Sequence, residues 1–443
     1  MANVYISFLG TNNYLPCHYV ADDFITPEPI RFVQEATIQF RCANWSEKDR
    51  ILIFTTEEAQ KCNWQDGGHC DRKTKKPHEG LQTRLQRLGL KVPFRSIPIA
   101  PGYTTEQIWQ QFNTVFEVLE EGDHVVFDIT HAFRSIPMLA LVVIHYARVF
   151  KSIAVGGIYY GAFEALGPQY QVEETIPENE RRAPIVDLTP LAELLDWTVA
   201  TDRFLKGGDT ALMGELAQRS VAHLLKASKG ADKDAQAVKN LGNALKRMSL
   251  ALSTCRGLEI SEVAKNLKEQ VAACAQSDLL PPFAKLFDRI QQRLHGFSGD
   301  PIVDGLAAVR WCCDHGLIQQ GYTLLEELLF SAVLLETGHD IQNREHRKIV
   351  SQAFYILEKN CVENPDRWKD TSNNHLDMTR RFIDVIRSKG DLYKKCSQIR
   401  EFRNDLNHAG HNPSAKTLKS AGRFAYDLQK LISDVERILV PLS

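Results

Sequence analysis

The residues with the clearest chemical potential form the stretch Arg403-Asn404-Asp405-Leu406-Asn407-His408. A histidine exchanges a proton near neutral pH, and an arginine binds the charge that grows on phosphate oxygens. Together they could perform acid–base chemistry on a phosphodiester. Asn404 lies four residues before His408, so on a helix the two would share one face and the amide could hydrogen-bond the ring.

A helix is predicted to carry this stretch. Apolar residues recur before and within it at three- and four-residue spacing, which is typical of one buried stripe: Leu392, Cys396, Ile399, Phe402 and Leu406. We expect Asp391 to cap the start and Gly410 to end the helix in a left-handed turn. His408 would then lie in the last turn, where the helix dipole favours the imidazolium form. On spacing alone, a structural role is the more common one for such a histidine.

Length and charge limit the classes of function. A chain of 443 residues predicts two or three domains, and a net charge of -2 gives no global attraction to nucleic acid. Any RNA contact must come from a local patch, and a solvated helix face is the alternative interpretation. The candidate patch lies between residues 376 and 403 and contains Arg380, Arg381, Arg387, Lys389, Lys394, Lys395, Arg400 and Arg403.

Apolar runs alternate with amphipathic stretches in the first 185 residues. Strands are expected at 4–9, 51–56, 92–100, 124–130 and 153–160, with helices at 104–121 and 135–150. This alternation predicts a parallel sheet of the doubly wound α/β class. In such sheets ligands bind at the carboxyl ends of the strands.

Two loops at these strand ends are candidate anion sites. The loop 10–14 has small residues that let backbone N–H groups approach a phosphate. The segment 128–135 opens a helix and offers a hydroxyl, an imidazole and a guanidinium. The alternative for this segment is that Asp128 and Thr130 only cap the turn and His131 is a core residue. The candidate ligand contacts are Gly10, Thr11, Asn12, Thr130, His131, Arg134 and Ser135.

A polar stretch at 61–80 contains four residues of the kinds that bind zinc: Cys62, His69, Cys70 and His78. Their spacing is not one of the usual paired patterns. We therefore interpret the stretch as a surface loop and expect no metal.

The charged, proline-marked stretch at 177–184 predicts a boundary, with domains at 1–185 and 186–443. Beyond it only helices are expected, at 189–207, 210–229, 232–255, 260–295, 317–336, 343–359, 375–388, 391–409 and 415–440. The part at 210–300 carries no motif, so it is either a helical connector or part of the following bundle.

Two resemblances bring these motifs together. The segments 5–11, 32–36 and 128–135 resemble the amino-terminal CARF domain of CRISPR-associated proteins. The Arg403–His408 stretch resembles the Arg-x4–6-His motif of HEPN ribonucleases, in which an asparagine often follows the arginine, as Asn404 does here. In this order they are similar to the CARF–HEPN ribonucleases of the Csx group from type III systems, and they cover most of the chain.

The resemblance implies a Rossmann-like α/β CARF domain that binds a cyclic oligoadenylate, followed by an all-α HEPN domain that cleaves single-stranded RNA. It implies a homodimer, with cyclic tetra-adenylate as the favoured activator and no cofactor. Arg403, Asn404 and His408 would be the catalytic residues. The products would be a 2′,3′-cyclic phosphate and a 5′-hydroxyl. Activator ring size, RNA base preference and assembly beyond a dimer are left open.

Two other functions remain open at the level of sequence. One is a nucleotide-sensing regulator without nuclease activity. The other is a ring nuclease, in which Thr130, His131 and Arg134 would help to cleave the cyclic ligand. The sequence shows no signal peptide and no apolar run long enough to span a membrane, and its ten cysteines fit reduced thiols, so a cytoplasmic protein is expected.

Overall fold

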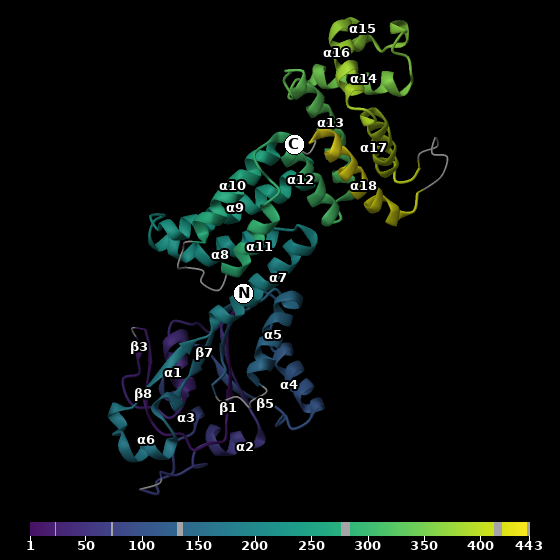
Figure 1. The fold of residues 1–443 in the computed structure, drawn as a ribbon. Helices are drawn as coiled ribbons and strands as arrows, with labels where there is room; N and C mark the ends of the chain where they lie inside the picture. Colours follow the sequence, from purple (N-terminus) through teal and green to yellow (C-terminus); the bar gives the residue numbers. More distant parts are fainter. Residues whose placement is uncertain (23, 72–73, 131–135, 276–283, 412–418, 441–443) are drawn as a thin grey trace. The chain divides into compact units, whose positions relative to one another are not determined.

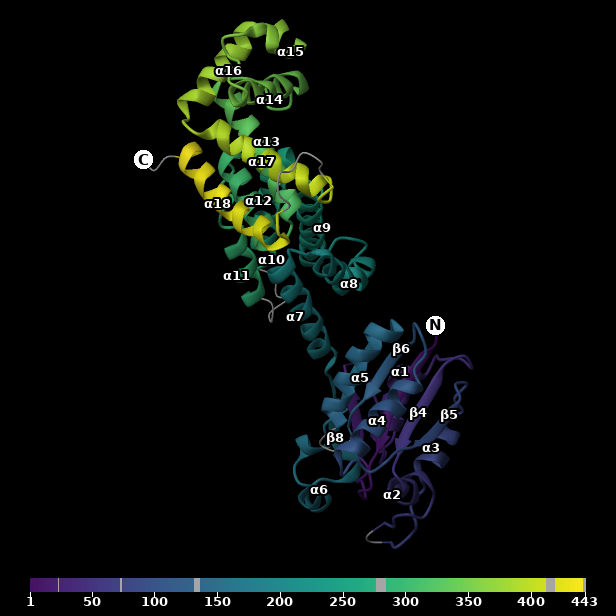
Figure 2. The same cartoon turned by 90° about the vertical axis from the view of Figure 1, so that its right-hand side faces the viewer.

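The computed structural model describes all residues except 23, 72–73, 131–135, 276–283, 412–418 and 441–443. The chain forms two compact units, Met1–Leu195 and Asp196–Ser443. Figures 1 and 2 show a sheet flanked by helices in the first and only helices in the described part of the second.

The first unit contains an eight-stranded sheet in the order β3-β2-β8-β7-β6-β1-β4-β5. The five strands from β7 to β5 in this order are mutually parallel. They are the five apolar runs expected from the sequence: β1 (Asn3–Leu9), β4 (Arg50–Thr55), β5 (Phe94–Pro98), β6 (His124–Asp128) and β7 (Ala154–Gly161). The prediction of an α/β domain with a parallel core is therefore confirmed.

Three further strands make the sheet mixed: β2 (His18–Ala21), β3 (Phe24–Ile25) and β8 (Arg182–Asp187). β8 runs antiparallel to β7 and parallel to β2, and β3 is antiparallel to β2. None of the three was expected. The predicted boundary at residue 185 falls inside β8, because Pro184 and the neighbouring charges were interpreted as linker sequence.

Helices cover both faces of the sheet (Figures 1 and 2). Alternate residues of β1 enter two different cores, as the two-residue period of a strand requires. Tyr5 packs in a cluster with residues of α1 (Val33–Cys42) and α3 (Leu81–Arg87). Val4 and Ile6 pack with residues of α4 (Thr105–Glu117) and α5 (Ile136–Lys151). The remaining elements are α2 (Glu57–Ala59), the π-helix η1 (Gln60–Trp64), η2 (Phe163–Leu166), α6 (Gln169–Thr175), η3 (Glu178–Glu180) and α7 (Thr189–Gly207).

The described residues of the second unit are helical, as expected. α13 (Ile318–Glu336) is its central helix, because it contacts α12, α14, α16, α17 and α18. The predicted helix at 260–295 is instead two helices, α10 and α11. The other elements are α8 (Ala211–Ala227), α9 (Lys233–Ser253), η4 (Gly257–Glu259), α10 (Ile260–Cys274), α11 (Ala284–Leu294), α12 (Pro301–Asp314), α14 (Arg344–Glu358), η6 (Pro365–Arg367), α15 (Asp370–Asn374), α16 (Leu376–Ser388), α17 (Leu392–Asn407) and α18 (Ala421–Leu439). Within the described ranges, none of the helices combines the length and the apolar character needed to cross a bilayer.

Candidate functional site

The helix α17 ends at the Arg403–His408 stretch. Four of its five predicted stripe residues are buried, and Leu406 is half-buried. Ala409 and Gly410 both have positive φ, so the predicted left-handed end is present, one residue earlier than expected. The start of α17 differs from the prediction, because the Asp391 side chain accepts no hydrogen bond from a backbone N–H of the first turn. Its carboxylate pairs with Lys394 at 2.7 Å instead.

His408 is the first residue beyond the helix and is exposed. Its backbone N–H donates to the Asn404 carbonyl at 3.0 Å. The described structure shows no side-chain hydrogen bond between Asn404 and the imidazole, so the expected pairing is not formed here. The neighbouring Asn407 accepts a hydrogen bond from Gln319 Nε2 at 2.9 Å, which ties this end of α17 to the first turn of α13.

Arg403 points at a buried carboxylate. Its Nη1 atom lies 2.5 Å from Oε2 of Glu326, whose side chain is only 3% exposed. The other oxygen, Oε1, accepts from Arg400 Nε at 2.7 Å. Arg400 also donates to the carbonyl and hydroxyl of Ser351 at 3.0 and 2.7 Å. One carboxylate from α13 thus holds two arginines of α17.

This geometry fixes the direction of Arg403 and leaves donors for a phosphate. The guanidinium carries five N–H donors, and the Glu326 contact uses one end of it. The Nε atom is buried without a hydrogen-bond partner, so the donors that could reach a phosphate are those of the Nη atoms of this 27% exposed side chain. Glu326 was not singled out from the sequence. Residues 324–329 contain two adjacent glutamates, Glu326 and Glu327, and only the structure shows that Glu326 is the buried one.

Acidic neighbours neutralise much of the predicted basic patch. Lys389 pairs with Glu336, Lys394 with Asp391, and Lys395 with Asp434. Arg400 and Arg403 share Glu326. For Arg380, Arg381 and Arg387 the described residues provide no ion pair, so within the patch these three cations carry no paired carboxylate.

In the first unit, the carbonyls of loop 10–14 are all engaged by side chains. Asn63 Nδ2 donates to the carbonyls of Gly10 and Asn12, both at 2.9 Å. The remaining three carbonyls bond to His69 Nε2 (Thr11), Gln169 Nε2 (Asn13) and Arg31 Nε (Tyr14). A loop held in this way has a fixed backbone, which suits a binding site.

The Tyr14 hydroxyl lies against the same loop. Burial raises the pKa of Tyr14, and hydrogen bonds from the backbone of Gly10 and Asn12 oppose that rise. These two N–H groups were expected to face a phosphate, and here they face a tyrosine oxygen instead. A ligand phosphate that used them would have to displace the Tyr14 hydroxyl.

Thr130 serves the turn that follows β6. Its N–H and hydroxyl donate to Asp128 Oδ1 at 3.0 and 2.5 Å, and the hydroxyl accepts from the Gly161 N–H at 2.8 Å. Asp128 is fully buried and also accepts from Tyr5 and Ser7, each at 3.0 Å. Asp128 and Thr130 therefore cap this turn, and the single hydroxyl proton of Thr130 is donated to Asp128.

A cavity of about 170 Å³ joins the two loops. It is lined by Asn12 and Thr130, so the structure brings together one candidate from each loop. Tyr14 of the first loop also lines it. The other lining residues were not singled out from the sequence: Leu15, Tyr19, Tyr160, Gly161, Phe163, Glu164 and Gln169. The candidates His131, Arg134 and Ser135 lie outside the described residues.

The stretch with the four candidate zinc-binding residues packs on loop 10–14 instead of standing apart from it. His69 bonds to the Thr11 carbonyl, and the Cys70 carbonyl accepts from Asn13 Nδ2 at 3.3 Å. His78 is half-buried, and burial together with the charge of Arg31 lowers its pKa. The stretch 61–80 therefore lies partly at the surface, as expected, and its described residues also hold loop 10–14 in place.

Comparison with known proteins adds one finding. No family model matches the chain. Over 234 residues, 52% of the chain, it is 24% identical to the CRISPR-associated protein MJ1674 of Methanocaldococcus jannaschii. The matched part amounts to 32% of the length of that relative. This similarity supports an association with CRISPR systems and extends no further.

Proposed function

We propose that this chain is a CRISPR-associated, cyclic-oligoadenylate-activated endoribonuclease that cleaves single-stranded RNA without a metal ion. Its first unit would be a CARF domain and its second a HEPN domain. The observation that carries the proposal is the end of α17, where His408 is exposed and Arg403 is held by the buried carboxylate of Glu326. The similarity to a CRISPR-associated protein supports the setting.

The proposed reaction uses a nucleophile that RNA supplies. The 2′-hydroxyl attacks the adjacent phosphorus, and the products are a 2′,3′-cyclic phosphate and a 5′-hydroxyl. His408 would transfer a proton, and Arg403 would bind the phosphate oxygens as their charge grows. Asn404, one residue beyond Arg403 and exposed, would orient the phosphate or the ring. No step in this scheme requires a Lewis acid.

Activation would start at the cavity between the two loops of the first unit. Cyclic tetra-adenylate is the favoured ligand, and Asn12 and Thr130 line the cavity that would receive part of it. A ligand can activate only by binding the active arrangement better than the inactive one. If two protomers share one ligand and one catalytic cleft, the ligand would bind most tightly to the dimer arrangement that also completes the cleft. That is the difference in affinity that activation requires.

An exposed apolar face on α5 supports a dimer of the first unit. Six apolar residues of this helix are exposed at spacings of three and four residues, which place them along one side of it: Met138 (74%), Leu141 (40%), Val142 (50%), Tyr146 (41%), Val149 (68%) and Phe150 (64%). Apolar groups concentrated on one helix face are typical of an interaction surface. We assign a second copy of the chain to it, because a two-fold axis would place the same face of each copy against the other.

The test is cleavage of a fluorescent single-stranded RNA in EDTA, with cyclic tri-, tetra- and hexa-adenylate added separately. We expect cleavage with one of these ligands, preferably the tetra-adenylate, and a cyclic phosphate at the new 3′ end. The His408→Ala variant should bind the same ligand and cleave nothing. His411, three residues later and also exposed, provides the matched control as His411→Ala.

Persistent cleavage by the folded His408→Ala variant would remove His408 from the mechanism. If the protein binds one of these ligands but none of them triggers cleavage, the result would instead favour a sensing regulator without nuclease activity. An Arg134→Ala variant that keeps full ligand affinity would argue against the anion site proposed for segment 128–135.

A further inference from the structure

The helix α13 has one polar face. Gln319, Thr323, Glu327 and Ser331 follow one another at four-residue intervals, and none of them is buried, although most neighbouring residues of the helix are. Gln319 bonds to Asn407, next to His408. Thr323 lies one turn further along, about 6 Å along the helix axis. This polar face therefore leads away from the candidate catalytic residues.

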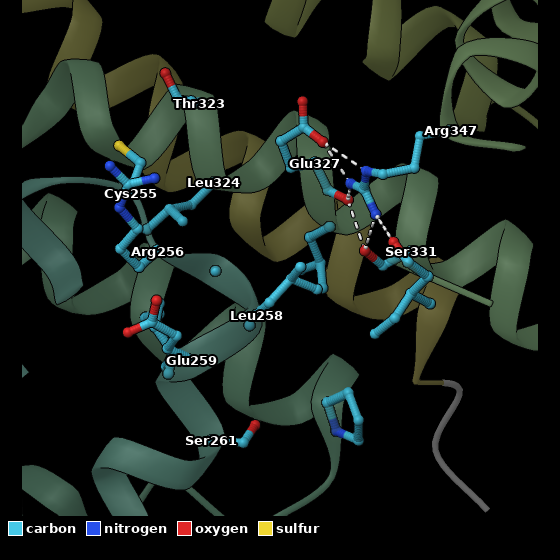
Figure 3. Close-up of a pocket in the computed structure, with 17 residues that line it drawn as sticks. Cys255, Arg256, Leu258, Glu259, Ser261, Thr323, Leu324, Glu327, Ser331 and Arg347 are labelled. Carbon is cyan, nitrogen blue, oxygen red and sulfur yellow. Dashed lines mark hydrogen bonds and ion pairs between the residues drawn. The ribbon is translucent and has the colours of Figure 1, made fainter. Parts of the chain in front are cut away.

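A cavity of about 560 Å³ lies along this face (Figure 3). That volume is within the range of pockets that hold small organic ligands. Three residues of the polar face line it, Thr323, Glu327 and Ser331, with Leu324 and Leu328 between them. The opposite walls come from α12 and from the segment 255–261, which includes the short helix η4.

The walls combine apolar surface with a few polar groups. Leu258, which is 56% exposed, and the largely buried Leu324 and Leu328 contribute apolar surface to the cavity. Arg256 is exposed, and among the described residues no carboxylate pairs with its guanidinium. Figure 3 shows Arg256 near Thr323 and Leu324, while Glu327 and Ser331 join Arg347 at another end of the cavity.

Glu327 is fixed in place and keeps one free oxygen. Arg347 donates to Glu327 Oε2 and the Glu327 carbonyl, and also to Ser331 and to the Ile341 carbonyl. These bonds use all five guanidinium donors. Both side-chain bonds to Glu327 end on Oε2, and the carboxylate is 45% exposed. Its Oε1 atom is therefore available to accept a hydrogen bond from a ligand.

We infer that this cavity receives a nucleotide of the RNA next to the cleaved bond and sets the base preference. The inference rests on the proposed ribonuclease function. Single-stranded RNA is read by inserting unstacked bases into pockets, where apolar side chains cover the base and polar groups meet its edge.

In this site Arg256 binds a flanking phosphate, the three leucines contact the base, and Glu327 Oε1 accepts from an exocyclic amino group. Adenine, cytosine and guanine have such a group. Uracil has no such group, and the two carbonyl oxygens on either side of its N3–H would be repelled by the carboxylate.

The test uses the full chain with its activator and a set of labelled single-stranded RNA 12-mers that differ only in the base beside one cleavable bond. We expect amino-bearing bases to be cleaved about tenfold faster than uridine, the ratio that one charge-assisted hydrogen bond can provide. Glu327→Gln should reduce that ratio, with its melting temperature recorded alongside. Arg256→Ala should raise KM with little change in kcat, and Arg256→Lys should restore part of the loss.

Lys348 gives a matched control, because it is an exposed cation of the same unit that does not line the cavity. Lys348→Ala should leave the base preference unchanged. An unaltered KM in Arg256→Ala, together with equal cleavage at all four bases by the unmodified chain, would overturn the nucleotide site and leave the ribonuclease intact. A chain that cleaves none of the RNAs with any activator would overturn both.

Discussion

Arg403 and Glu326 form an ion pair in which Nη1 lies 2.5 Å from Oε2, and the same carboxylate also binds Arg400. The pair joins α17 to the central helix of the second unit. The two carboxylate oxygens of Glu326 face the guanidinium groups of Arg400 and Arg403. Water is excluded there, since the Glu326 side chain is only 3% exposed. The direction of the candidate catalytic arginine is therefore decided by a residue 77 positions earlier.

Glu326→Gln should lower both stability and activity. Removing one partner of a buried pair leaves an uncompensated charge, which destabilises by about 3 kcal/mol. The melting temperature of the helical unit should fall by several degrees, measured by calorimetry. Arg403 would also lose its orientation, so kcat of the remaining folded protein should fall while activator binding is unchanged.

Arg400→Ala separates these two effects. It removes a pair on the same carboxylate, and it should destabilise the helical unit without acting on the substrate phosphate. If both variants lower the melting temperature equally and both keep full kcat, the Glu326 carboxylate has only a structural role.

Arg403→Lys should keep the ion pair and lose catalysis. A lysine ammonium can reach Glu326, but it lacks the second set of donors that a guanidinium offers to phosphate oxygens. We expect kcat to fall by about 100-fold, the typical loss when one donor to a developing charge is removed. The melting temperature should change little. A variant with wild-type kcat would show that Arg403 does not contact the reacting phosphate.

The sequence predicted the parts of this structure that depend on local pattern. Apolar runs mark β1, β4, β6 and β7, whereas β5 contains Arg95 and Ser96, and the buried stripe of α17 follows helical spacing. These patterns are visible without partners. β8 was missed because it is a strand only through its pairing with β7 and β2, which are distant in sequence or unpredicted. In addition, Pro184 is typical of a linker. Glu326 was missed for the same reason, since its arginine partners lie more than 70 residues further along the chain.

The loops of the first unit show the same limit. The residue types predicted a site at the ends of β1 and β6, and Asn12 and Thr130 do line one cavity. The supports of that site, Asn63 and His69, come from a stretch that sequence spacing presented only as a weak metal motif. Their hydrogen bonds end on backbone carbonyls, which leave no pattern in the sequence.

Asp128→Asn should change how stability depends on pH. Burial raises the pKa of Asp128, against hydrogen bonds from Thr130, Ser7 and Tyr5. The folded chain therefore holds this proton more tightly than the unfolded chain, whose carboxyl has a pKa of about 4. The unfolding free energy must fall as the pH rises from about 4 through the higher folded value.

The Asp128→Asn variant has no such proton, so its melting temperature should decline less over this pH interval than that of the unmodified chain. The hydroxyls of Tyr5 and Ser7 can rotate to accept from the new amide, which limits other losses. Melting curves from pH 4 to pH 8 provide the measurement. Parallel profiles for the two proteins would mean that Asp128 titrates normally in the fold.

Val149→Glu should reduce self-association through the exposed face of α5. Val149 is 68% exposed, and under a two-fold arrangement each copy would bring a buried carboxylate to the interface, at a cost of several kcal/mol. We expect a dimer for the unmodified chain and a shift toward monomer for the variant, measured by sedimentation equilibrium. RNA cleavage should fall in parallel, because the proposed catalytic cleft requires two protomers.

Tyr170→Glu on α6 is the matched control for this face. Tyr170 is a 61% exposed aromatic residue of the same unit, on a different helix from α5. The added charge should leave the mass and the activity unchanged, which separates a specific interface from a general effect of charge on solubility. Equal masses for Val149→Glu and the unmodified chain would exclude α5 as the contact, whatever the assembly of the protein.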